Sequence, residues 1–228
     1  MKLLFNLVVN DIRKNRIISS ILFAFLMLSA VLLTGGLRIG VTSITSINAL
    51  SSVAQIPDYI QMHKGDYDEK AIDDFVKNHD YIEAFQVTKM LNIKNSELYH
   101  NGESFENSLM DNSFVAQNEG FDYLLDMNNE IAIINKGEIG IPIYYAQELG
   151  IELGDSIRVE KGSYTKDFKV STIIRDAQMN SALTSSKRLL INEADLSELS
   201  NNLGEWEYCF EFLLEEGSIA SLETDYIG

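Results

Sequence analysis

An uninterrupted apolar segment near the N-terminus constrains this chain more than any other feature. Residues 17–37 read IISSILFAFLMLSAVLLTGGL and contain no charged side chain. At about 1.5 Å of rise per residue, a helix of this length spans roughly 30 Å, the thickness of the hydrocarbon core of a bilayer. The segment is apolar on every face, whereas a helix at the surface of a globular protein is polar on one side. The sequence therefore predicts a transmembrane helix over residues 17–37.

The basic residues around this segment predict its orientation. Most of them precede it, and only Arg38 follows it closely. Because cytoplasmic flanks are enriched in Lys and Arg, we expect a chain in the cell membrane with a cytoplasmic N-terminus and an extracellular body. The alternative is a cleaved signal peptide, although both the basic region and the apolar run are longer than is usual for one. The membrane-anchoring flank consists of Lys2, Arg13, Lys14 and Arg16.

Residues 1–16 have the pattern of an interfacial helix. Leu4, Phe5, Val8 and Ile12 share one helical face, and polar or basic residues lie opposite. Such a helix lies on a membrane surface with its cations near anionic head groups, so membrane lipids are expected partners. An ordinary cytoplasmic tail is the competing interpretation.

The charge of the chain divides at the end of the apolar segment. The net charge is −16, but residues 1–37 hold four basic groups and one acid, a net +3, and the remainder holds 14 basic and 33 acidic groups, a net −19. So acidic a body excludes a nucleic-acid partner, since phosphate binding needs a cationic surface. A single cysteine, Cys209, excludes an internal disulfide.

The body is predicted to be α+β. Residues 38–56 contain no Gly or Pro after Gly40, which favours a helical stalk over a flexible linker, and Pro57 ends it. Residues 57–228 follow as a mixed α/β ectodomain. Its first elements, a strand at 59–63, a helix at 68–78 and a strand at 82–93, indicate a βαβ unit.

The rest of the body is predicted less regularly. Residues 94–130 read as an inserted subdomain that contains an Asn101–Gly102 hairpin turn and a helical turn at 121–125. In the strand predicted at 206–214, Glu207, Cys209 and Glu211 alternate with aromatic residues and are expected to form an exposed acidic face. The other expected elements are strands at 130–135, 157–160, 167–175 and 189–191 and helices at 143–149 and 193–199.

Motifs for catalysis, metals and cofactors are missing from the sequence. The three His residues have no partner at a metal-ligand spacing, and the acidic segments 65–69 and 126–130 lack the pattern of a calcium loop. Residues 184–187 resemble a Ser-Lys hydrolase motif without its companion motifs, and no glycine-rich phosphate loop is present. We therefore expect no catalytic residue, metal or cofactor, and a protein that binds or transmits rather than catalyses.

One segment carries a family resemblance. Residues 141–157 read IPIYYAQELGIELGDSI, and they resemble a segment of the ectodomains of FtsX-like (MacB-type) ABC transporter permeases. In this segment we expect Ala146 and Leu149 to pack a helix on the sheet, Gly150 to turn the chain, and Gly154 with Asp155 to lead into the next strand. Residues 168–180 and 185–192 are similar to the Gram-positive branch of the same family.

The resemblance implies a permease subunit that transmits the motion of a separate cytoplasmic ABC ATPase to its ectodomain, for export or extraction of lipid, lipoprotein or peptide. It also implies a dimer with itself or with a related permease. The family has three further membrane helices after the ectodomain, so the chain is expected to be an N-terminal fragment or a split permease. A single-pass anchored binding or sensor protein is the alternative.

The loop expected to face a partner contains Asp176, Gln178, Met179, Asn180 and Ser181.

Overall fold

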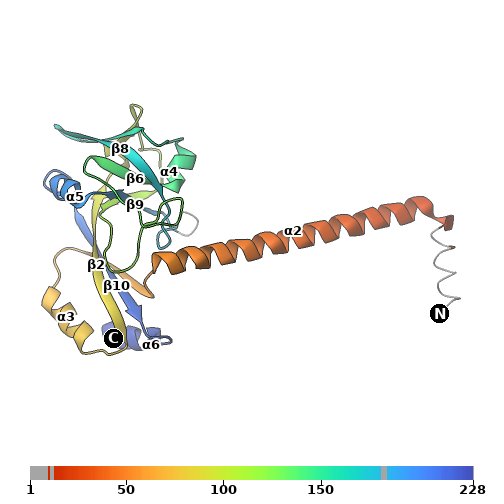
Figure 1. Cartoon of the computed structure of the whole chain (residues 1–228), viewed down its shortest axis with the longest axis horizontal. Helices are drawn as coiled ribbons and strands as arrows, with labels where there is room; N and C mark the ends of the chain where they lie inside the picture. The colour runs from red at the N-terminus through yellow and green to blue at the C-terminus, as the bar shows by residue number, and fades with distance from the viewer. Residues whose placement is uncertain (1–9, 11–12, 181–183, 228) are drawn as a thin grey trace. The chain divides into compact units, whose positions relative to one another are not determined.

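The computed structural model describes residues 10, 13–180 and 184–227 (Figure 1). The chain divides into two compact units, Met1–Ala49 and Leu50–Gly228. The interfacial helix predicted for residues 1–16 falls largely outside the described residues. Within them, one helix is long and apolar enough to cross a membrane, and none of the residues in its apolar window is buried by the rest of the chain.

This helix, α2, runs from Arg16 to Ala54, so it includes both the predicted transmembrane segment and most of the predicted stalk. Its last five residues belong to the second unit. Gln55 then adopts a left-handed conformation with φ of 51°, and the Ile56 N–H donates back to the Ser51 carbonyl at 3.3 Å. This arrangement is a Schellman cap, and Pro57 follows where the helix cannot continue.

The second unit confirms the α+β class. Ten strands form one mixed sheet in the order β1-β10-β2-β5-β9-β6-β8-β7-β3-β4. Most of its neighbours are antiparallel, but β5 is parallel to β9 and β6 is parallel to β8. The strands are β1 (Tyr59–Lys64), β2 (Ile82–Ile93), β3 (Leu98–His100), β4 (Glu103–Ser104), β5 (Asp111–Val115), β6 (Glu138–Pro142), β7 (Ser156–Lys161), β8 (Tyr164–Ile174), β9 (Ser186–Ile191) and β10 (Trp206–Leu214).

The sheet curls around its main hydrophobic core. Strands β2, β3 and β5 to β9 all contribute buried side chains to one cluster, together with helix α5 (Glu193–Ser200). A second cluster lies where β1, β10 and the first half of β2 pack against α3 (Glu69–Lys77) and α6 (Ile219–Leu222). The long strands β2 and β10 reach from one cluster to the other (Figure 1).

The predicted βαβ unit is present with one strand inserted. Both β1 and β2 pair antiparallel with β10, so they run parallel to each other on either side of it. Helix α3 connects them, and Asp68 caps its N-terminus by accepting a hydrogen bond from the Ala71 N–H at 3.0 Å. The inserted segment 94–130 contributes β3, β4 and β5 to the same sheet, with the Asn101–Gly102 turn joining β3 to β4.

Helix α4 (Ile143–Glu148) forms where the sequence predicts it, but a different residue anchors it. Leu149 is 39% exposed and Ala146 is only partly buried, whereas Tyr145 is fully buried. The Tyr145 hydroxyl donates to Asn112 Oδ1 at 2.9 Å, which satisfies its polar end inside the core. Gly150 has φ of 65° and Gly154 has φ of 96°, so both glycines occupy the turns predicted for them.

Two predicted elements are wrong. Residues 121–125 are not helical: Asp122 has φ of 53°, and Leu125 forms isolated bridges with Ile131 and Arg175. Residues 130–135, all within the described part of the chain, form no strand beyond the bridge at Ile131, and the strand begins later, at Glu138. The short apolar run at 131–134 does not form a strand: Ile133 is 83% exposed, while Ala132 is buried in a loop.

A glycine between α5 and β10 is required by the fold. Gly204 has φ of +49°, and a Cβ atom there would lie 2.2 Å from the backbone oxygen of Asn92. We expect Gly204→Ala to lower the free energy of unfolding by about 2 kcal/mol, through steric overlap and left-handed strain. Gly217→Ala is the matched control, because Gly217 also has positive φ, but a methyl group added there would meet no atom of the described residues within 4 Å. The free energies of unfolding of both variants can be measured by urea unfolding, followed by the fluorescence of the single tryptophan, Trp206. An equal loss of stability in the two variants would contradict the prediction.

Candidate functional site

The end of α2 is held by a segment from the middle of the sheet domain. The Asp122 N–H donates to the Gln55 carbonyl at 2.8 Å, and the Tyr123 N–H donates to the Ala54 carbonyl at 2.8 Å. Leu50 and Ala54 are buried in one cluster with Leu125. We call residues 50–56, 120–125 and 175–180 the helix-to-domain junction.

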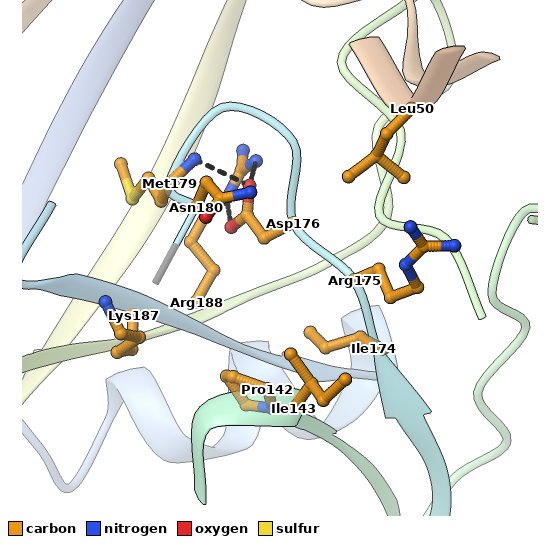
Figure 2. Close-up of a pocket in the computed structure, with 10 residues that line it drawn as sticks. All are labelled: Leu50, Pro142, Ile143, Ile174, Arg175, Asp176, Met179, Asn180, Lys187 and Arg188. Carbon is orange, nitrogen blue, oxygen red and sulfur yellow. Dashed lines mark hydrogen bonds and ion pairs between the residues drawn. The ribbon is translucent and has the colours of Figure 1, made fainter. Parts of the chain in front are cut away.

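An ion-pair network links this junction to strand β9. Arg188 lies on β9, and its Nε and Nη2 donate to the two carboxylate oxygens of Asp176 at 2.7 and 2.6 Å (Figure 2). Its Nη1 contacts Asp122. The Arg188 side chain is 1% exposed, and those of Asp122 and Asp176 are 0% and 5% exposed. Bidentate pairing of this kind fixes orientation as well as charge.

Main-chain hydrogen bonds reinforce the same connection. Leu125 and Arg175 exchange N–H···O bonds of 3.2 and 2.7 Å, and Asp176 Oδ1 accepts from the Met179 N–H at 2.7 Å. The loop after β8 and the segment that holds α2 are therefore joined twice, once by backbone and once by Arg188. Arg188 thus connects β9 to both segments.

The charges in the network are strongly coupled. Burial alone would lower the pKa of Arg188, but the negative charges of Asp122 and Asp176 outweigh it and raise this pKa well above its ordinary value. The guanidinium group therefore stays charged. Removing the arginine, or removing the aspartates, would leave an uncompensated charge in the interior. This is far more costly than losing an ion pair at the surface.

A third buried carboxyl group, that of Glu211, lies beside the network. The prediction that the acidic face of strand 206–214 is exposed is therefore wrong at this residue. Glu211 and Cys209 are both 0% exposed, because the segments around Asp122 and Gln178 cover that face of β10. Burial, and then the charge of Asp122, raise the pKa of Glu211 to about 7, although the hydrogen bond from Gln86 and the charge of Arg188 lower it. Burial and the charge of Glu211 likewise raise the pKa of the Cys209 thiol.

A small cavity of about 120 Å³ adjoins the junction (Figure 2). On its polar side, Lys187 is buried and its Nζ donates to the carbonyls of Thr184 and Ser186 at 2.6 and 3.1 Å. Burial lowers the pKa of this lysine. The lining residues are Leu50, Pro142, Ile143, Ile174, Arg175, Asp176, Met179, Asn180, Lys187 and Arg188.

The residues predicted to face a partner are divided by the structure. Asp176 and Met179 are buried, so neither offers an exposed contact surface. Gln178 and Asn180 are partly buried, and Ser181 lies outside the described residues, as does Lys2 of the membrane-anchoring flank. Arg13, Lys14 and Arg16 are exposed. A partner-facing role stays a prediction for the part of the loop that is not buried.

Sequence reasoning missed Arg188, Asp122 and Glu211 as members of one site. A weak signal exists, because Asp122 is an acid between aromatic residues and Arg188 directly precedes the apolar run 189–191. Neither signal identifies the partner, since the three residues come from separate parts of the chain. Among the described residues, no group of three or more His, Cys, Asp or Glu side chains is arranged to hold a metal ion.

Comparison with known proteins finds likeness to solved structures but none in sequence to a family or a curated protein. No protein-family profile and no curated protein matches the sequence. Among solved structures, the chain is similar to a domain of a Porphyromonas gingivalis protein that is provisionally described as a permease, with 14% identity and a TM-score of 0.38. The likeness covers 65% of this chain and 63% of that one, so less than two thirds of that structure is matched.

Proposed function

We propose that the chain is the N-terminal membrane helix and extracellular domain of an FtsX-like (MacB-type) ABC transporter permease of the Gram-positive branch. In this role it couples a separate cytoplasmic ATPase to movement of the extracellular domain, for export or extraction of lipid, lipoprotein or peptide. It would act as a dimer with itself or with a related permease, and it would need no catalytic residue or cofactor of its own.

The observation that carries the proposal is the unbroken course of α2 from Arg16 to Ala54. Its first part is apolar and unburied, as a lipid-facing helix should be. The carbonyl of its last residue, Ala54, accepts a hydrogen bond from the Tyr123 N–H, and that of the next residue, Gln55, accepts one from the Asp122 N–H. A continuous helix is a stiff element, because each residue adds a backbone hydrogen bond. A helix whose end is bonded to a domain core beside a buried ion-pair network is suited to relaying displacement.

The expected orientation can be tested by cysteine labelling. Ser163, in the β7–β8 turn, and Asn10 are both exposed, while the native Cys209 is buried and gives little background. In intact cells, we expect a membrane-impermeant maleimide to label Ser163→Cys, and to label Asn10→Cys only after permeabilisation. Labelling of Asn10→Cys in intact cells would contradict the orientation. Loss of residue 10 from the mature chain would instead support a cleaved signal peptide.

The coupling role predicts a specific partner. Full chain extracted from its native membrane in mild detergent should co-purify with an ABC-type ATPase, identified by mass spectrometry. The reading frame beyond Gly228 should also encode three further hydrophobic segments. A correctly inserted chain with neither property would overturn the permease proposal and favour a single-pass anchored binding or sensor protein.

A further inference from the structure

The buried charges of the junction do not balance. Three carboxyl groups, those of Asp122, Asp176 and Glu211, are buried around one guanidinium group, that of Arg188. If all of them were ionised, the network would hold two more negative charges than positive ones, which is a costly arrangement. Lys187 is a second buried cation that acts on Asp176, but its Nζ donates to the carbonyls of Thr184 and Ser186. Arg188 is already committed to Asp122 and Asp176 through its donors. Glu211 is therefore the carboxyl group that gains most from holding a proton.

Hydrogen bonds from Gln86 and Thr88 favour the ionised form of Glu211, but one neighbouring acceptor is suited to its protonated form. Gln86 Nε2 donates to Glu211 Oε2 at 2.6 Å, whereas Gln178 Nε2 lies 3.5 Å from Oε1, at the limit of a hydrogen bond. The Gln178 Oε1 atom is buried and has no hydrogen-bond partner among the described residues. A protonated Glu211 carries an O–H group. If the side-chain amide of Gln178 is rotated by about 180°, so that its oxygen and nitrogen exchange places, this oxygen can accept a hydrogen bond from that O–H group.

The groups that face Glu211 come from its own strand and from five other segments. Asp122 from the segment before β6 is the nearest source of negative charge, and Arg188 from β9, itself paired with Asp176, is the source of positive charge. Gln178 approaches from the loop after β8. The remaining neighbours are uncharged: Gln86 and Thr88 on β2, Cys209 on the same strand, and Ile60, its register partner on β1.

From this geometry we propose that Glu211 is a proton-binding site that sets the stability of the helix-to-domain junction. With its proton, Glu211 is a neutral hydrogen-bonding group and the Arg188–Asp122–Asp176 network is undisturbed. When the proton leaves, a second negative charge appears beside Asp122, and the repulsion favours opening of the segment that holds α2. Its consequence for transport rests on the proposed coupling function, but proton binding itself does not.

The pH dependence follows from the direction of the pKa shift. The ordinary pKa of a glutamate is near 4.5, and that of Glu211 in the folded chain is raised to about 7. At a pH below the ordinary pKa, Glu211 holds its proton in both the folded and the open state. Its contribution to the stability of the junction is then fully present. Between the two values the open state releases the proton first, so stability falls as pH rises and the loss is complete above about pH 7.

The test compares Glu211→Gln, an uncharged mimic of the protonated acid, with wild-type full chain in detergent micelles. Glu215→Gln, an exposed acid just beyond the same strand, is the control. Amide hydrogen exchange, corrected for intrinsic rates, should show that protection at Asp122, Tyr123 and Met179 falls by about ten-fold or more between about pH 5 and pH 8 in wild type. Glu211→Gln should abolish this fall, and Glu215→Gln should retain it.

Infrared difference spectroscopy gives a second readout that does not depend on opening. A protonated-carboxyl band should be present at about pH 5 in wild type, disappear on titration through about pH 7, and be missing in Glu211→Gln. Absence of that band in folded wild type, or a pH-dependent protection loss that persists in Glu211→Gln, would overturn the proposal. Failure to find an ABC ATPase partner would overturn the coupling function and leave these two readouts unchanged.

Discussion

Replacing Arg188 with leucine is expected to lower the free energy of unfolding of the sheet domain by about 3–5 kcal/mol. The change removes the guanidinium group that compensates Asp122 and Asp176, whose carboxylates are buried at 0% and 5% exposure. Two negative charges then remain in the interior without the positive charge that paired with them. Since a whole domain is stable by only about 5–15 kcal/mol, a loss of this size leaves little margin.

The measurement is urea unfolding of the full chain in detergent, followed by the fluorescence of Trp206. Arg158→Leu is the matched control, because Arg158 also pairs with a carboxylate, Asp167, but both side chains are about half exposed. An exposed pair of this kind contributes at most about 1 kcal/mol. If the two substitutions cost the same, the network does not stabilise the junction.

A triple variant separates lost charge compensation from lost packing. Adding Asp122→Asn and Asp176→Asn to Arg188→Leu removes both uncompensated charges, so a large part of the stability should return. Asparagine is suited to position 122, where φ is 53°, because it tolerates the left-handed region better than most residues. A triple variant no more stable than Arg188→Leu would mean that the shape of Arg188, and not its charge, matters.

Replacing Ser46 with proline is expected to break α2 between the predicted membrane segment and the sheet domain. Ser46 is exposed in the interior of the helix, where proline removes one backbone hydrogen bond, clashes with the preceding turn and costs about 3 kcal/mol. The sheet domain should be unaffected, since Ser46 lies outside the unit Leu50–Gly228. Under the proposed function, coupling should be lost while the ATPase still co-purifies.

Spin labels at positions 41 and 53, on either side of the substitution, measure the break directly. Ser46→Ala is the control, because alanine preserves the helix. The distance distribution should be narrow in Ser46→Ala and broad or shifted in Ser46→Pro, with the same Trp206 unfolding midpoint in both. A narrow distribution in Ser46→Pro would show that the helix tolerates the break. Intact coupling in a chain whose helix is demonstrably broken would contradict the relay.

Elements with a local and repeating signal were predictable from the sequence. The uncharged run 17–37 identifies its helix by length and composition, and the Asn101–Gly102 turn follows from the chemistry of its two central residues. Prediction failed at 121–125, where the backbone is bonded to the distant residues Gln55 and Arg175. It also failed at 130–135, where the Ala132 N–H donates to the Leu124 carbonyl and the Ile134 carbonyl accepts from Asn192. At α4 the helix was predictable, but its buried anchor, Tyr145, was not, because it depends on a bond to Asn112.

An apolar helix followed by an acidic α+β body can be inferred from the amino-acid sequence alone, because helix length, charge and strand alternation are properties of consecutive residues. The burial of Glu211 and the connection of Asp122 to Asp176 through Arg188 arise only in the folded chain. On β10, alternation places Glu211 opposite the aromatic face, but whether that side meets water depends on what covers it. The segments that cover it, around Asp122 and Gln178, are irregular and come from elsewhere in the chain. No periodic pattern in the sequence predicts their position. The site exists because folding brings those segments together over one strand.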